Sequence, residues 1–223
     1  MDFIEVYDRA LNPETCDYFR SRLDRAITEG DAVFGEEESR TGTADCTKND
    51  GEYDETEQLG ALNRNDAWML INGADADDLL GRCVPAIQEC LDRYLIKYAS
   101  LQKYELTLST LRIQKSFLHG GLHFWHFENW PKYYGGKYGD KTVRKIARQI
   151  AFVIYLNDIP ENEGETEFLY QGRRINPVEG RVMLCPAGFT HIHRANPVYT
   201  KEKYIVAGNI EFSLPEVSHV NSA

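Results

Sequence analysis

Residues 149–157 read QIAFVIYLN, a nearly continuous apolar run that is typical of a β-strand buried on both faces. Turn sequences such as NEGE, YQGR and PVEG follow it and separate further short runs. The β-like runs from residue 104 onward are 104–115, 149–157, 165–170, 181–185, 190–194 and 203–213. One short helical candidate, 141–148, interrupts them. This half of the chain therefore predicts a β sandwich or barrel.

Two amphipathic helices are predicted before residue 104. Asn12 can cap the first helix, Pro13 suits its first position, and Gly30 supplies its end. The second helix covers about 76–99, and Pro85 either kinks it or marks its start. We expect a mainly β fold with flanking α-helices, in which the N-terminal helices pack on one sheet.

The length and composition predict one domain. The chain has 223 residues, of which 42% are hydrophobic, enough for a sizeable core. We expect a single domain over 1–223, with helical support and an acidic lid in 1–103 and the β core in 104–213. The sequence contains no apolar run long enough to cross a membrane and does not start like a signal peptide. Five scattered cysteines without a CxxC pair indicate a reducing, cytoplasmic location.

The charge is acidic and unevenly distributed. The formal net charge is −10, and residues 31–58 hold ten acidic side chains against two basic ones, a local −8. This balance disfavours nucleic acid as a partner. We expect residues 31–66 and 133–141, which are aperiodic and contain glycine, to form a mobile lid over the barrel mouth. The acidic charge of residues 31–58 has two interpretations, a solvated loop or a lid that attracts a basic substrate.

Five of the six histidines lie in two short segments. His119, His123 and His126 occur in HGGLHFWHFENW, and His191 and His193 occur in FTHIHRANPV. His126 and Glu128 are two residues apart, so on a strand they project from the same face. A histidine from a distant strand would complete a 2-His-1-carboxylate metal site with open coordination positions, as non-haem Fe(II) oxygenases use.

The segment 104–213 resembles the 2-oxoglutarate- and Fe(II)-dependent oxygenases, specifically the prolyl 4-hydroxylase-like branch. Four features carry the resemblance in the family's order: HFE at 126–128, YLND followed by GETEF at 155–158 and 164–168, PVEGRVMLCP at 177–186, and HRANPV with a lysine ten residues after its histidine. The resemblance implies a double-stranded β-helix, also called a jelly roll or cupin-like barrel. It also implies a dioxygenase that hydroxylates an unactivated C–H bond, such as one in a prolyl residue.

The resemblance also implies the site residues. Fe(II) would be bound by His126, Glu128 and His193, and the co-substrate 2-oxoglutarate by Lys203 with Thr166. No catalytic residue beyond the metal ligands is implied, and ascorbate would be supportive. Residues near the metal or on the substrate side would be His191, Arg194 and His123. The partners would be O₂ and a peptide or small-molecule substrate that the sequence does not identify, and no oligomeric state is predicted.

The sequence departs from the family pattern at three positions. Glu128 replaces the usual aspartate, and Ser116 and Phe117 stand where the family often has a tyrosine that helps to bind the co-substrate. Asn209 stands where a tryptophan is often found beyond the lysine. Two other functions therefore remain open, a cupin-like metal-dependent hydrolase or isomerase, and a non-catalytic binding protein on the same fold.

Overall fold

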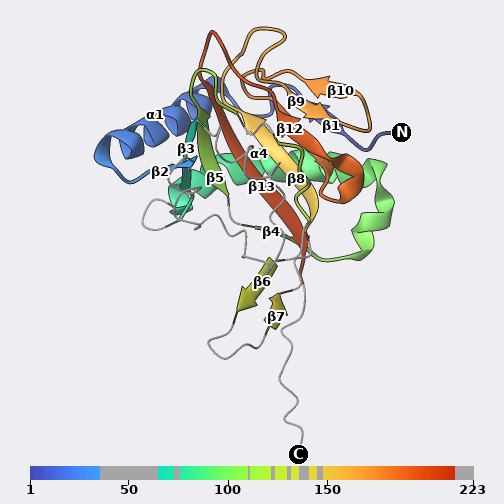
Figure 1. The fold of residues 1–223 in the computed structure, drawn as a ribbon. Coiled ribbons are helices and arrows are strands. Elements are labelled where there is room, and N and C mark those ends of the chain that lie inside the picture. Colours follow the sequence, from blue (N-terminus) through green and yellow to red (C-terminus); the bar gives the residue numbers. More distant parts are fainter. Residues whose placement is uncertain are drawn as a thin grey trace, which may run out of the picture.

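An eight-stranded antiparallel sheet is the largest feature of the computed structural model, which describes residues 1–35, 65–72, 76–109, 111–121, 124–129, 132–135, 141–144 and 148–213 (Figure 1). Its strands are β1 (Glu5–Tyr7), β2 (Val33–Phe34), β3 (Asp66–Leu70), β4 (Leu106–Leu108), β5 (Arg112–Ser116), β8 (Arg148–Tyr155), β11 (Val182–Pro186) and β13 (Lys203–Phe212). They pair in the order β1-β11-β8-β13-β5-β3-β2, and β4 pairs with the end of β13.

A second, smaller sheet faces the first. It has three antiparallel strands in the order β10-β9-β12, which are β9 (Thr166–Phe168), β10 (Arg173–Ile175) and β12 (His193–Ala195). Side chains of both sheets share one apolar layer, which includes Ala151, Met183, Phe168 and Ile175. The two facing antiparallel sheets form the predicted double-stranded β-helix.

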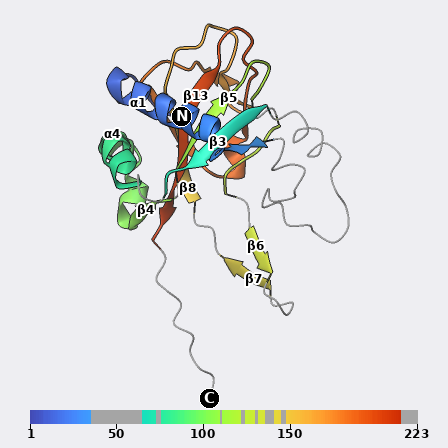
Figure 2. The same ribbon diagram turned by 90° about the vertical axis from the view of Figure 1, so that its left-hand side faces the viewer.

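Two helices cover the other face of the large sheet. They are α1 (Pro13–Glu29) and α4 (Ala76–Lys97), and both lie on the same side of the sheet (Figure 2). The predicted caps of α1 are confirmed, because Asn12 Oδ1 accepts a hydrogen bond from the Thr15 backbone N–H at 2.8 Å and Gly30 ends the helix at φ 82°. A 3-10 turn, η2 (Ala99–Lys103), follows α4.

Strand β8 is buried on both faces, as its sequence predicts. Ile150, Phe152 and Ile154 belong to the core beneath the helices, whereas Ala151 and Tyr155 belong to the layer between the two sheets. This alternation follows from the two-residue period of a strand. It divides the large sheet into a helix-covered outer face and an inner face that lines the barrel.

Several details differ from the prediction. The helical candidate 141–148 is wrong, because β7 (Lys141–Arg144) pairs with β6 (Lys132–Gly135) in a two-stranded ribbon and β8 begins at Arg148. Pro85 lies inside α4 and does not start it. The predicted strand 190–194 is a 3-10 turn, η3 (Phe189–His191), followed by β12. The sheet also contains β1, β2 and β3 from before residue 104, none of which was predicted.

The predicted lid falls mainly on residues that the structure leaves undescribed. Residues 36–64 of the segment 31–66 and residues 136–140 of the segment 133–141 lie outside the described ranges. The described ends of these segments include strand β2 and parts of β3, β6 and β7. A mobile lid remains a prediction.

Candidate active site

A short antiparallel bridge brings the two histidine segments together. The His126 N–H donates to the His193 carbonyl at 3.0 Å, and the His193 N–H donates to the His126 carbonyl at 2.9 Å. The Glu128 N–H donates to the Ala187 carbonyl at 3.1 Å, which fixes the carboxylate segment beside the end of β11. The imidazole rings of His126 and His193 lie 4.5 Å apart, although 66 residues of chain separate them.

The side chains of His126, Glu128 and His193 form a cluster that fits one metal ion. One nitrogen or oxygen atom of each lies within 4.8 Å of the others, and His126 Nε2 lies 3.6 Å from Glu128 Oε1. Both imidazoles are oriented in the same way. His126 Nδ1 lies 3.1 Å from the Phe124 carbonyl, and His193 Nδ1 lies 2.9 Å from the His191 carbonyl. A carbonyl only accepts, so Nδ1 carries the proton in both rings and Nε2 keeps its lone pair for a metal.

The charge states of the cluster suit a divalent cation. Burial and the neighbouring charge of His126 lower the pKa of His193 to about 4, so this imidazole is neutral near pH 7. Burial alone would raise the pKa of the Glu128 carboxyl, but the hydrogen bond and charge of His126, with the charges of Arg112 and His193, hold it far below its usual range. A neutral imidazole at His193 and an ionised carboxylate at Glu128 are ligand forms that a metal requires.

The second oxygen of Glu128 is held by two side chains of the large sheet. Arg148 Nη1 lies 3.3 Å from Glu128 Oε2 and donates to the Glu128 backbone carbonyl at 3.0 Å. Asn209 Nδ2 lies 3.4 Å from the same Oε2. These contacts leave Oε1 on the side of the histidines. They orient a carboxylate that is one methylene longer than the family's aspartate.

Lys203 is a buried cation on the inner face of β13. Lys203 is 2% exposed, and its Nζ donates to the Gly164 carbonyl at 2.8 Å. Burial lowers the pKa of Lys203 to about 8, although the charge of Glu165 opposes the shift. Gly164 adopts φ +70°, and a Cβ at this position would lie 2.9 Å from Val198 Cγ1. Glycine is therefore the residue that lets this carbonyl approach the ammonium.

Two hydroxyl groups lie in the same layer. The Tyr155 hydroxyl and Thr166 Oγ1 are 2.7 Å apart, and both residues are buried. Thr166 was predicted, whereas Tyr155 was missed. Tyr155 pairs with Ile205, two residues along β13 from Lys203 on the same face. The inward parity of β8 is the signal that could have identified it, but parity needs a register that the sequence does not supply.

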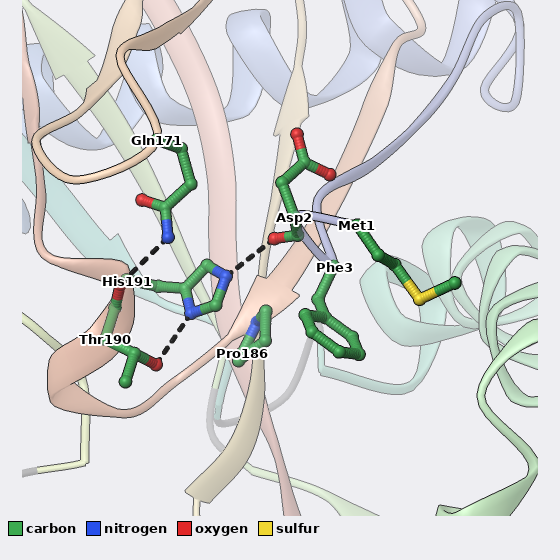
Figure 3. A pocket seen from close by; sticks show the side chains of 7 residues that line it. All are labelled: Met1, Asp2, Phe3, Gln171, Pro186, Thr190 and His191. Carbon is green, nitrogen blue, oxygen red and sulfur yellow. Dashed lines mark hydrogen bonds between the residues drawn. The ribbon is translucent and has the colours of Figure 1, made fainter.

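The three residues predicted near the metal or on the substrate side have different surroundings. His191 is buried, with Nδ1 2.9 Å from the Thr190 hydroxyl and Nε2 2.7 Å from the Asp2 carbonyl (Figure 3). Its ring thus holds the N-terminal segment, and only its backbone carbonyl contacts His193. The pocket in Figure 3 is lined by Met1, Asp2, Phe3, Gln171, Pro186, Thr190 and His191.

Arg194 lies on the small sheet and is held by its neighbours. Its Nε and Nη2 donate to Glu167 Oε2 at 2.9 and 2.7 Å, and its guanidinium stacks on the Trp125 ring at 4.4 Å. These partners account for its charge within the protein. His123 lies outside the described residues.

The comparisons with known proteins agree with this geometry. Residues 114–211 match the family model described as the 2OG-Fe(II) oxygenase superfamily. The matched segment covers 98 of the 223 residues and contains His126, Glu128, His193 and Lys203. The cofactors of this superfamily are Fe(II) and 2-oxoglutarate, and the described ligand cluster fits the metal. The resemblance drawn from the four sequence features is confirmed. No curated protein matches the chain.

Solved structures share the fold at low identity. A prolyl hydroxylase from Trichoplax adhaerens, in complex with a hypoxia inducible factor peptide fragment, has a TM-score of 0.61 and 13% identity over 95% of this chain and 84% of that one. A Pseudomonas putida prolyl-4-hydroxylase has a TM-score of 0.59 and 17% identity over 95% of this chain and 94% of that one. A viral collagen prolyl hydroxylase from Paramecium Bursaria Chlorella virus-1, in complex with 2OG, has a TM-score of 0.58 and 15% identity over 94% of this chain and 96% of that one.

No helix in the described part of the chain is both long and apolar enough to cross a membrane.

Proposed function

We propose that this oxygenase binds Fe(II) through His126, Glu128 and His193, and the distal carboxylate of 2-oxoglutarate through Lys203. One observation carries the second assignment. Lys203 is a buried cation inside the barrel, and its only hydrogen bond among the described residues goes to a backbone carbonyl. A buried charge is costly unless it is paired. A carboxylate of the co-substrate would supply the missing partner.

The hydroxyls of Thr166 and Tyr155 would complete the co-substrate site. Their oxygens are 2.7 Å apart, so one hydroxyl can donate to the other, and the second can donate to a carboxylate that sits between them and Lys203. Tyr155 would then replace the tyrosine that is missing at Ser116 and Phe117. Burial raises the pKa of Tyr155, so it stays a neutral hydrogen-bond donor at physiological pH.

Bound iron and 2-oxoglutarate supply the oxidation of a C–H bond by O₂, coupled to the decarboxylation of 2-oxoglutarate to succinate. The protein residues hold the ligands and exclude water. Arg148 and Asn209 would fix the direction of the Glu128 carboxylate, and Ala151 and Phe168 belong to the apolar layer that walls the site.

A prolyl residue of a peptide or protein is one substrate that this proposal includes. It is supported by the fold shared with the prolyl hydroxylases above. The cytoplasmic location is also a proposal, and it is supported by Cys16, Cys83, Cys90 and Cys185, which are free and buried. Residues 1–223 are proposed to form one domain, because β1 and β3 pair with strands from the second half of the chain. Ascorbate is proposed as a supporting reductant.

The test is anaerobic addition of Fe(II) and then 2-oxoglutarate to the purified protein. A visible charge-transfer band that appears only with both would support the chelate, and aeration should convert 2-oxoglutarate to succinate. Absence of the band, together with hydrolytic activity of the zinc form, would contradict the proposal in favour of a cupin-like hydrolase.

A further inference from the structure

Three polar side chains on the inner face of the large sheet have atoms without partners. The Arg112 guanidinium forms no hydrogen bond or ion pair with any other residue in the described ranges, although it is partly buried. Trp68 Nε1 and Asn209 Oδ1 are buried and have no hydrogen-bond partner there. Buried polar atoms are almost always paired, with protein, water or a ligand. Three such groups in one region therefore point to a ligand.

The sheet register places these three residues on one diagonal. Trp68 pairs with Gln114, and Arg112 pairs with Ala207. Trp68 is therefore the diagonal neighbour of Arg112 on β3, and Asn209 is its diagonal neighbour on β13. Diagonal neighbours on one face are about 7–8 Å apart, within reach of long side chains. The Trp68 indole, the Arg112 guanidinium and the Asn209 amide thus line a continuous strip of the barrel wall.

Other polar residues of the same wall already have partners. Gln114 Nε2 donates to Asp66 Oδ2 at 2.6 Å. Arg148 contacts Glu128 on one side and has its Nε 3.6 Å from Glu211 Oε1 on the other. The charge of Arg148 is thus paired with two carboxylates, although its buried Nε forms no hydrogen bond with the described residues. The strip formed by Trp68, Arg112 and Asn209, called the polar strip below, is different in this respect.

The polar strip lies next to the proposed metal site. Asn209 Nδ2 is 3.4 Å from Glu128 Oε2. A carboxylate only accepts hydrogen bonds, so the amide nitrogen faces Glu128 and Oδ1 faces away from it. A group bound to Oδ1 would be a close neighbour of the metal ligand. Arg112 is also near enough for its charge to act on the Glu128 carboxyl.

We propose that the polar strip binds the free carboxylate of the substrate, and that the substrate is an amino acid or an N-acyl amino acid. The Arg112 fork matches a carboxylate, and Trp68 Nε1 adds one donor. Asn209 Oδ1 is an acceptor, so it needs an N–H, which the amino or amide nitrogen next to a carboxylate supplies. The inference rests on the proposed function, since it names the substrate class of the same site.

The test compares carboxylates with their neutral amides. The Mn(II) form of the protein with 2-oxoglutarate is titrated with free L-amino acids, N-acetyl-L-amino acids and the corresponding carboxamides, and thermal protection is measured. At least one carboxylate should protect the protein while its amide does not. The same carboxylate should stimulate succinate formation by the Fe(II) form. Arg112→Leu should weaken its binding about tenfold or more, because hydrogen bonds to a charged group are lost, and Trp68→Phe should have a smaller effect.

The control is Arg25→Leu, which removes an exposed arginine from α1 on the far side of the sheet and should change nothing. If no carboxylate binds better than its amide, or if binding survives Arg112→Leu, the inference is wrong. It is also wrong if Arg112→Leu weakens 2-oxoglutarate binding in the absence of substrate, because the arginine then serves the co-substrate. In each of these outcomes, 2-oxoglutarate binding that depends on Lys203 leaves the proposed function intact.

Discussion

Replacement of Lys203 by methionine should weaken co-substrate binding and at the same time stabilise the co-substrate-free protein. Methionine keeps most of the side-chain volume, so the change removes a charge without opening a cavity. Truncation of one partner in a buried charge pair costs about 2–5 kcal/mol. The Kd for 2-oxoglutarate should therefore rise by about 30-fold or more.

The opposite effect on stability follows from the burial of the same ammonium. Its pKa falls from 10.5 to about 8, a difference of about 2.5 units. At about 1.4 kcal/mol for each unit, the charged lysine disfavours the folded state at pH 7 by about 3 kcal/mol. The variant also loses the hydrogen bond to the Gly164 carbonyl, which is worth about 1 kcal/mol. The free energy of unfolding should rise by about 2 kcal/mol.

Two measurements check this prediction. Urea unfolding at pH 7 without metal or 2-oxoglutarate gives the stability, and titration of 2-oxoglutarate into the anaerobic Fe(II) form gives the Kd. Lys201→Met is the matched control, since Lys201 is exposed and two residues away; it should shift stability by less than about 0.5 kcal/mol and leave the Kd unchanged. A Lys203→Met protein that is less stable than wild type and binds 2-oxoglutarate equally well would refute the assignment.

Further predictions concern pH and the metal. Above about pH 8, the apparent Kd for 2-oxoglutarate should rise about tenfold for each pH unit, because Lys203 loses its proton. The free energy of unfolding of the co-substrate-free protein should increase between about pH 8 and 10.5, because Lys203 is still protonated in the unfolded chain but not in the folded one. Binding and unfolding titrations across pH 7–10 check both. Glu128→Ala should lower metal affinity by more than the about 10–100-fold expected when a residue that only contacts a metal ligand is replaced. Glu128→Asp should retain activity. If Glu128→Ala is as active as wild type, Glu128 is not a metal ligand. Arg148→Gln should lower Mn(II) affinity about tenfold or more, measured by calorimetry, because it releases Glu128 Oε2. His191→Ala should lower the free energy of unfolding by about 1–3 kcal/mol and leave metal affinity nearly unchanged, since its ring holds Asp2 and Thr190 and does not contact the metal cluster.

Local patterns in the sequence are sufficient to predict α1, β8 and the three residues of the candidate metal cluster. Each end of α1 is set by a nearby residue, the start by Asn12 and the end by Gly30. The apolar run of β8 reports burial on both faces directly. The spacing of His126 and Glu128 puts two candidate ligands on one side of an extended segment, and the motif after β11 supplies His193 as the third candidate.

Tertiary structure alone decides which distant strands pair and in what register. The short strands β1 and β3 have no period that a sequence can reveal, and they exist because β11 and β5 offer them backbone partners. The segment from Lys141 has helical spacing but pairs as β7 with β6. Register then determines that Tyr155 lies beside Thr166 and that Arg148 and Asn209 meet Glu128. It also places Arg112 on the inner face, where it forms no hydrogen bond or ion pair with the described residues. A shift of one residue would turn each of these side chains to the opposite face, so their roles depend on pairings between residues far apart in the chain.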